Sequence, residues 1–174
     1  MAALPRFTYH PDPVATGAVE KSDAECACCG KARGYVYAQA PYCEEDDLEG
    51  AICPWCIADG SAAKKYDATF VQEVENGAPD SVVKEIMERT PGYESWQGEI
   101  WLTHCNDACE FHGDMSRADL AALSPEAEAQ FLAENDFIDD WPEFKKHYAP
   151  KGDTALYKFV CRHCGLVRIG VDMS

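Results

Sequence analysis

The chain has 174 residues, 47% of them hydrophobic, which is enough to bury a core as one domain or two small subdomains. Its 31 Asp and Glu against 15 Lys and Arg give a formal net charge of -16, which disfavours nucleic acid and anionic lipid as partners. No stretch reaches the roughly 20 apolar residues of a membrane span, and the start, MAALPRFTYHPDP, does not read as a secretory signal. We therefore expect a cytoplasmic protein whose ten cysteines are mostly thiols or thiolates, because reducing compartments disfavour disulfides.

The first set of cysteines lies in CACCGK and CPWC. Cys26 and Cys29 form a C-x-x-C followed by Gly30, and the second motif repeats the spacing after an interval typical of zinc sites. Two residues between thiolates let one tight turn aim both sulfurs at a tetrahedral ion. The pattern predicts a structural zinc site whose four ligands are Cys26, Cys29, Cys53 and Cys56.

The segments around these pairs predict the local fold. RGYVYAQAPYC alternates Tyr35 and Tyr37 and predicts a strand or hairpin, and IADGSAAKKYD predicts a short helix despite Gly60. A knuckle, a hairpin and a helix with the second ligand pair in its first turn form the order of a treble-clef zinc finger. We expect such a subdomain over residues 20–68, where the amides at the helix start would also favour thiolate charge.

Two other uses of these cysteines remain open, and a third is disfavoured. CPWC is compatible with a thioredoxin-like redox pair, and four thiolates can also hold an iron–sulfur cluster. A zinc deaminase is disfavoured, because Pro54 follows the first cysteine of its pair rather than preceding it and no H-x-E is present. Tetrahedral zinc is the default for two knuckles.

Helices and a strand are predicted through the middle of the chain. PDSVVKEIMERT, residues 79–90, has an apolar stripe and ends at Pro91-Gly92, so it predicts a helix. YESWQGEIWLTH then predicts a strand that leads into a second metal site. SRADLAAL predicts a short helical turn, and SPEAEAQFLAEN a helix capped by Ser124 with Pro125 at its first position.

The second set of cysteines is spread over a longer part of the sequence. WLTHCNDACEFHG places two cysteines three residues apart, and FVCRHCGLVRIGV places a C-x-x-C between the strand-like runs ALYKFV and LVRIGV. We expect Cys161 to Gly165 to form the knuckle of a C-terminal hairpin, with His104 or His112 substituting if one cysteine points away. The predicted second zinc site has the ligands Cys105, Cys109, Cys161 and Cys164.

The fold expected is α+β: a treble-clef-like zinc finger packed with a second zinc-knuckle hairpin subdomain and several short helices. The second subdomain would span residues 93–174, with a helical insertion at about 114–150. Two cysteines are left over; Cys28 would neighbour the first site, and Cys43 would act as a small apolar residue.

Two acidic stretches are candidate contacts for a basic protein. EEDDLE covers Glu44–Glu49, and ENDFIDDWPEF covers Glu134–Phe144, where acids alternate with aromatic residues. Exposed carboxylates around aromatic anchors suit an interface with a basic partner, although the aromatics could equally be core and the acids merely solvated. The candidate contacts are Glu44, Glu45, Asp46, Asp47, Asp136, Asp139, Asp140 and Trp141.

The motifs CACCGK, CPWCIADGSAAKKYD, RTPGYESWQGEIWLTHCNDACEFHG and CRHCG together resemble the CbrC-like family of bacterial proteins over nearly the full length. The resemblance implies one domain over residues 1–174, with the eight predicted ligand cysteines at the family's cysteine positions. It implies no established enzymatic activity. It also implies an association with tolerance to a DNA-cleaving colicin.

Together these observations lead us to expect a non-enzymatic immunity protein, stabilised by two structural zinc ions, that binds and inhibits a DNase-type antibacterial toxin. The chain carries no Ser-His-Asp pattern, P-loop, G-x-G-x-x-G or H-E-x-x-H. A zinc-dependent or redox stress enzyme, and a zinc-binding adaptor with another basic partner, are the alternatives.

Overall fold

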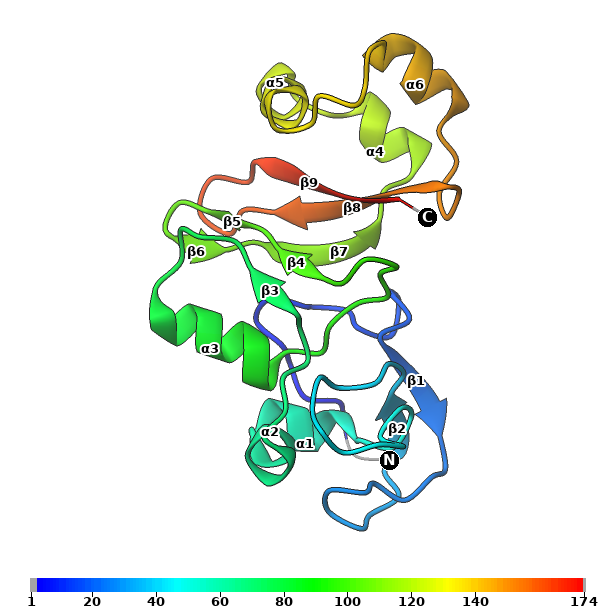
Figure 1. Ribbon diagram of the computed structural model, residues 1–174, viewed down its shortest axis with the longest axis vertical. Coiled ribbons are helices and arrows are strands. Elements are labelled where there is room, and N and C mark those ends of the chain that lie inside the picture. The colour runs from blue at the N-terminus through cyan, green and yellow to red at the C-terminus, as the bar shows by residue number, and fades with distance from the viewer. Residues whose placement is uncertain (1–2, 174) are drawn as a thin grey trace.

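The computed structural model describes residues 3–173 and arranges them in tiers along the long axis of the molecule (Figure 1). One end holds the strands and helices of residues 19–66. The middle holds the elements of residues 73–108, and the far end holds a sheet of residues 110–114 and 154–173 beneath the helices of residues 117–147. The fold is therefore a mixture of α and β elements, as expected.

The N-terminal end is built on one antiparallel strand pair. β1 (Val19–Ser22) pairs with β2 (Gly34–Tyr37), and the turn that carries the first C-x-x-C lies between them in the sequence. The strand predicted around Tyr35 is confirmed. The single helix predicted after CPWC is wrong: Gly60, at φ +76°, separates α1 (Pro54–Ala58) from α2 (Ser61–Tyr66). A positive φ stops helix propagation, and glycine adopts it at little cost.

The middle tier contains a parallel strand pair connected by a helix, followed in the chain by a small antiparallel hairpin. β3 (Glu73–Val74) pairs in parallel with β4 (Ile100–Trp101), and α3 (Asp80–Arg89) makes the connection. β5 (Thr103–His104) then pairs antiparallel with β6 (Asp107–Ala108). The helix predicted over residues 79–90 is thus confirmed, and the predicted strand is present as the two short strands β4 and β5.

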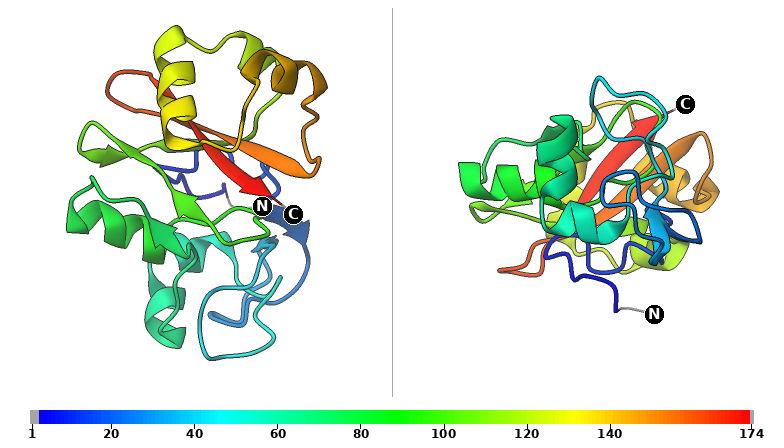
Figure 2. Two further views of the ribbon diagram at one scale, coloured as in Figure 1. Left: turned by 45° about the horizontal axis from the view of Figure 1, so that its top comes forward. Right: turned by 90° about the horizontal axis from the view of Figure 1, so that it is seen from below.

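The C-terminal sheet has the order β7–β8–β9, all antiparallel. Its strands are β7 (Glu110–Asp114), β8 (Thr154–Val160) and β9 (Val167–Met173), and the C-terminal hairpin predicted from ALYKFV and LVRIGV is β8–β9. Between β7 and β8 the chain forms α4 (Arg117–Ala121), α5 (Pro125–Glu134) and α6 (Trp141–His147). These helices cover one face of the sheet (Figures 1 and 2).

Helix starts in this region follow local capping chemistry. The Ser124 hydroxyl accepts a hydrogen bond from the N–H of Ala127, and Pro125 occupies the first helical position of α5, as predicted. Ser116 and Asp119 form a reciprocal capping box at the start of α4. Asp140 caps α6 by accepting from the N–H of Glu143.

Three apolar clusters hold the tiers together. The central cluster contains aromatic residues of β4, β7 and β8; the ring of Tyr93 stacks on that of Phe111 at 4.2 Å between centroids. A second cluster surrounds the first cysteine set, and a third joins α4–α6 to the sheet through Leu120, Phe131 and Leu156. Within residues 3–173, no helix has the length and hydropathy needed to cross a membrane.

His10 is a polar residue inside this core, with no exposed surface. Its Nδ1 lies 2.8 Å from the carbonyl oxygen of Pro91, which can only accept, so Nδ1 carries the proton and donates. Nε2 lies 2.7 Å from the hydroxyl of Thr16, and the rings of Trp101 and Phe111 pack edge-on against the imidazole. Burial disfavours the charged ring and lowers the pKa of His10 to about 4.

Replacing His10 by Gln should make the free energy of unfolding depend less steeply on pH below pH 7. Below its ordinary pKa of 6.5 the unfolded chain protonates His10, whereas the folded chain does so only near pH 4, so stability falls as the pH drops through this window. Between pH 7 and 5 this linkage amounts to about 2 kcal/mol. Urea unfolding of both chains under metal saturation measures the difference. Parallel profiles for the two chains would show that His10 is not a source of the acid sensitivity.

Candidate metal centres

The first group of possible ligands is formed by Cys26, Cys29, Cys53 and Cys56, whose Sγ atoms all lie within 4.8 Å of one another. Two local structures deliver them. Cys26 to Gly30 form a tight turn in which the N–H of Gly30 donates to the carbonyl of Cys26 at 2.7 Å, with Gly30 at φ +68°. Cys53 is the N-cap of α1, and Cys56 follows in its first turn. The structure thus brings together all four residues predicted for this site.

Backbone amides make the first group favourable for thiolates. The N–H of Cys53 donates to the Sγ of Cys26 at 3.2 Å. Burial raises the pKa of the Cys26 thiol, but the N–H groups of Cys53, Cys29 and Cys28 outweigh it and bring the pKa to about 7. Burial raises the pKa of Cys53 to about 11. The Cys26 thiol therefore ionises readily, whereas a bound cation would be needed to ionise Cys53 near neutral pH.

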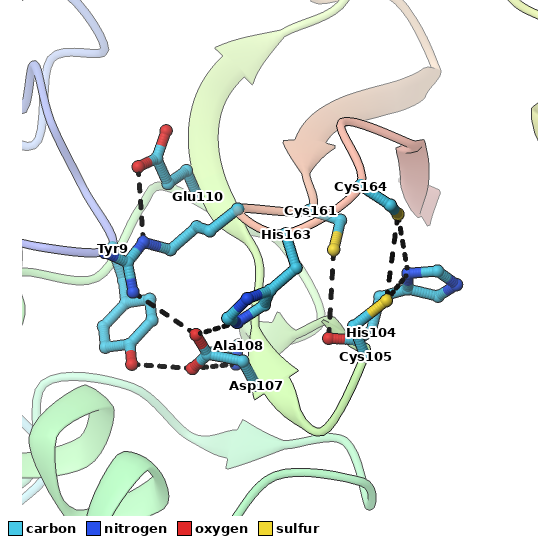
Figure 3. A network of polar contacts seen from close by, with 10 residues as sticks. Tyr9, His104, Cys105, Asp107, Ala108, Glu110, Cys161, His163 and Cys164 are labelled. Carbon is cyan, nitrogen blue, oxygen red and sulfur yellow. Dashed lines mark hydrogen bonds and ion pairs between the residues drawn. The ribbon is translucent and has the colours of Figure 1, made fainter.

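The second group is His104, Cys105, Cys161 and Cys164, again with all ligand atoms within 4.8 Å. The Nδ1 atom of His104 lies 3.3 Å from the Sγ of Cys105 and 3.4 Å from the Sγ of Cys164, and the two sulfurs are 3.8 Å apart (Figure 3). Cys161 is buried, whereas Cys105 and Cys164 are exposed. This group is therefore more open to solvent than the first, where three of four residues are buried.

A tight hairpin turn sets the position of Cys105. Thr103 pairs with Ala108 and His104 with Asp107, so Cys105 and Asn106 alone form the turn between β5 and β6. Both have positive φ, 53° and 59°, the combination of a type I′ hairpin turn. The left-handed conformation is unfavourable for a cysteine, by roughly 1–2 kcal/mol. Strained backbone conformations are often found where they orient a functional side chain, and the left-handed conformation of Cys105 occurs at a candidate ligand.

The other two ligands come from the turn between β8 and β9. The N–H of Gly165 donates to the carbonyl of Cys161 at 2.9 Å, and Gly165 has φ +75°, so this turn repeats the geometry of Cys26 to Gly30. Burial raises the pKa of Cys161, but the N–H groups of Cys164 and His163 lower it to about 6. The predicted C-terminal knuckle is present.

Cys109 is not among the four residues of the second group. It is fully buried in the central apolar cluster, its N–H donates to the carbonyl of Leu102, and burial raises its thiol pKa to about 12. A spacing of three residues brings two ligands together in a helix or a compact loop, but along a strand it separates them at about 3.3 Å per residue. The substitute His104 is in the group, whereas His112 lies on the surface, with Nε2 3.4 Å from a carboxylate oxygen of Glu110.

The two leftover cysteines lie next to the first group. Both Cys28 and Cys43 are partly buried and pack against the apolar cluster that surrounds it. The Sγ of Cys28 lies 3.7 Å from the hydroxyl of Ser61, and the Sγ of Cys43 lies 3.5 Å from the carbonyl of Glu45.

The residues predicted to contact a partner fall in two exposed segments and one interior position. Glu44, Glu45, Asp46 and Asp47 are all exposed, next to the buried Leu48. Asp136, Asp139 and Asp140 are exposed as well, although the Asp140 side chain is engaged in capping α6. Trp141 is buried and stacks on Phe144, so its ring belongs to the core. Phe137 is the exposed aromatic of this segment.

The fold and its two groups define a small mixed α/β protein that could hold two metal ions, each by four side chains. A family profile described as "uncharacterised protein family (UPF0167)" matches residues 4–173. UPF0167 protein PA1536 of Pseudomonas aeruginosa is 46% identical over 177 residues, or 98% of both chains. UPF0167 proteins of Mycobacterium bovis and Mycobacterium tuberculosis are 41% identical over 172 residues, 94% of this chain and 90% of theirs. No solved structure matches the chain significantly. The chain belongs to the UPF0167 family.

The fourth ligand of the second group can be tested with two alanine variants. We expect His104→Ala to lose tight binding of one of two metal ions, because it removes a ligand. Cys109→Ala should keep both ions, because it replaces a small apolar side chain in the core. Metal content after gel filtration measures this. Loss of an ion from Cys109→Ala, with both ions retained in His104→Ala, would instead establish the four-cysteine set.

A second pair of variants tests whether the first ion is structural. Cys53→Ser removes a buried ligand and should lose one ion together with most of the stability, because metal binding free energy becomes folding free energy. Cys43→Ser, outside the group, should cost only about 1 kcal/mol. Thermal unfolding and metal content of both variants decide this. Equally small shifts in Tm would contradict a structural role.

Proposed function

We propose that the protein is a zinc-stabilised cytoplasmic immunity protein that binds a DNase-type antibacterial toxin one to one and inhibits it. The observation that carries the proposal is a pocket of about 620 Å³ whose apolar lining, Phe137, Ile138 and Phe144, adjoins the carboxylates of Asp139, Asp140 and Glu143. An apolar pocket with an acidic rim suits a basic protein that inserts one apolar or aromatic side chain.

The acidic rim is available for a partner to different degrees. Glu143 already accepts from Lys146 and His147, each at 2.8–2.9 Å, and Asp140 caps α6. Among the described residues, no hydrogen bond or ion pair engages Asp136 or Asp139. These two carboxylates therefore carry the strongest attraction for an incoming cation.

The second acidic segment, Glu44 to Asp47, lies at the opposite end of the molecule from α6 in Figure 1. Its acids are exposed, but Glu44 to Asp47 includes no apolar residue, and the adjacent Leu48 is buried. We therefore assign the inhibitory contact to the helical end. The Glu44 to Asp47 segment then adds to the long-range field, which speeds association with a basic surface.

Zinc is the metal we propose at both groups. Thiolate and imidazole ligands in fours are the usual environment of structural Zn²⁺. A Cys₄ and a Cys₃His shell around Zn²⁺ would bring the formal charge from -16 to about -19, which strengthens attraction to a basic partner. For residues 20–68 the knuckle and ligand-bearing helix support a treble-clef-like description, although β2 pairs with β1, which precedes the knuckle.

The kind of basic partner comes from the resemblance to the CbrC-like family and its association with colicin tolerance. A DNase presents a basic groove for DNA, and an acidic protein can occupy or shadow that groove. An enzyme has less support, because catalytic zinc keeps a position for water and each group here offers four protein ligands. An adaptor for another basic protein would use the same surface.

The proposal predicts inhibition that depends on one acidic patch. The chain should block DNA cleavage by a colicin-type DNase domain at equimolar ratio and about 150 mM salt. The double variant Asp136→Asn, Asp139→Asn should inhibit about tenfold more weakly, because it removes one carboxylate of the rim and one exposed carboxylate next to Phe137 in the sequence. Glu20→Gln with Asp23→Asn makes the same charge change elsewhere on the exposed surface and serves as the matched control.

Titration of cleavage rate against inhibitor, repeated over a panel of such nuclease domains, gives the result. An unaltered cleavage rate with every member of the panel would reject the immunity function. Equal weakening by the control variant would place the contact away from the pocket.

A further inference from the structure

The four ligands of the second group come from two turns that no strand pairing joins directly among the described residues. His104 and Cys105 lie on the β5–β6 hairpin, which is a sheet of its own, whereas Cys161 and Cys164 lie between β8 and β9 of the three-stranded sheet. Both turns must keep a fixed separation for the ligand atoms to remain within 4.8 Å. Strand β7, which follows β6 after Cys109, pairs with β8 at Glu110 and Val160 and so connects the two turns through the backbone. Side-chain contacts fix the remaining separation between the tips of the turns.

One carboxylate lies between the two turns. Asp107, on β6, accepts through Oδ1 from the hydroxyl of Tyr9 at 2.7 Å and from the N–H of Ala108 at 2.8 Å. Through Oδ2 it accepts from Nε2 of His163 at 2.8 Å and from the guanidinium of Arg162 at 3.3 Å. Figure 3 shows Asp107 facing Tyr9 and His163, with Cys161, Cys164, His104 and Cys105 on the opposite side of His163 from Tyr9.

The two oxygens therefore have different roles. Oδ1 holds the N-terminal segment and the hairpin itself, whereas Oδ2 reaches across to the knuckle, because His163 lies between the ligands Cys161 and Cys164. The Asp107 side chain is only 11% exposed, so its hydrogen bonds are largely protected from competing water.

We propose that Asp107 is the positioning residue of the second metal centre: its Oδ2 holds the hairpin turn and the knuckle at the separation that metal binding needs. Asp107 is not one of the four ligands. It acts by preorganisation, because a site whose turns are already in place loses less conformational freedom when the ion binds. Groups hydrogen-bonded to metal ligands typically change affinity by about 10–100-fold. Asp107 bonds to sequence neighbours of the ligands, Arg162 and His163, and we take the same range as its expected scale.

The inference requires a metal at the second group but no toxin partner, so it stands or falls independently of the immunity function. The inference also applies to the second centre alone. The hydrogen-bond partners of Asp107 among the described residues are Tyr9, Ala108, Arg162 and His163, none of which is a ligand of the first group, so the first centre of the same chain serves as an internal reference.

The substitution Asp107→Asn isolates the cross-turn contact. The amide oxygen can keep the two bonds of Oδ1, from Tyr9 and Ala108. The amide nitrogen cannot accept from Arg162, and it can bond to His163 only if the imidazole moves its proton to Nδ1 and accepts, so the charged contact with the knuckle is lost. Tyr9→Phe is the matched control, since it removes one Oδ1 bond and leaves the contact with the knuckle intact.

The measurement is competition for Zn²⁺ between the full-length chain and a chromophoric chelator, with Co²⁺ absorption distinguishing the four-sulfur centre from the three-sulfur centre. We expect Asp107→Asn to weaken the second centre by about 10–100-fold and the first by less than about twofold. Tyr9→Phe should leave both affinities within about twofold of the parent. Equal weakening of both centres, or no change at the second, would overturn the proposal.

His163→Ala provides a second route if Asp107→Asn folds poorly, because His163 is half exposed and its loss leaves the core intact. His163→Ala should lower the affinity of the second centre for Zn²⁺ and leave that of the first unchanged. In a double-mutant cycle its effect should largely vanish in the Asp107→Asn background, since both changes remove the same contact. Fully additive effects would show that the two residues act separately and would overturn the positioning role.

Discussion

The structure depends on cysteine sulfurs that are crowded together in two places. In the first group the Sγ atoms of Cys53 and Cys56 are 3.6 Å apart, and two further sulfurs lie within 4.8 Å. Several thiolates cannot share such a space without a cation, because each raises the proton affinity of the next. A metal ion removes this repulsion and converts it into attraction. With metal bound at both groups, this attraction would hold the irregular segments that carry the ligands in place.

The two candidate metal centres use turns of the same geometry in different surroundings. The turns Cys26 to Gly30 and Cys161 to Gly165 have the same hydrogen bond and the same glycine conformation. The first turn meets a helix start inside an apolar cluster, and the second meets an exposed hairpin held by Asp107. The first centre therefore relies on burial. The second relies on a polar network, and this network also ties the N-terminal segment, through Tyr9, to the sheet.

The sequence allowed the local parts of this account to be predicted, because their chemistry lies within a few residues. Both knuckles and the Ser124 cap follow from C-x-x-C-G spacing and capping rules, whereas the helix after Pro79, which has no side-chain cap, follows from its apolar stripe and the Pro91-Gly92 stop. The departures come from long-range packing. The Cys105 to Cys109 interval forms a hairpin strand, which places Cys109 in the core, and Trp141 is buried against helix α5 and Phe144. Asp107 has no motif, since its partners Tyr9 and His163 are 98 and 56 residues away.

X-ray absorption at the metal edge of the purified full-length protein tests the central claim most directly. Two ions held by Cys26, Cys29, Cys53, Cys56 and by His104, Cys105, Cys161, Cys164 should show seven sulfur and one nitrogen neighbours in total. The expected distances for zinc are about 2.3 Å to sulfur and about 2.0 Å to nitrogen. A folded protein that contains no metal, or a shell dominated by oxygen, would contradict the account.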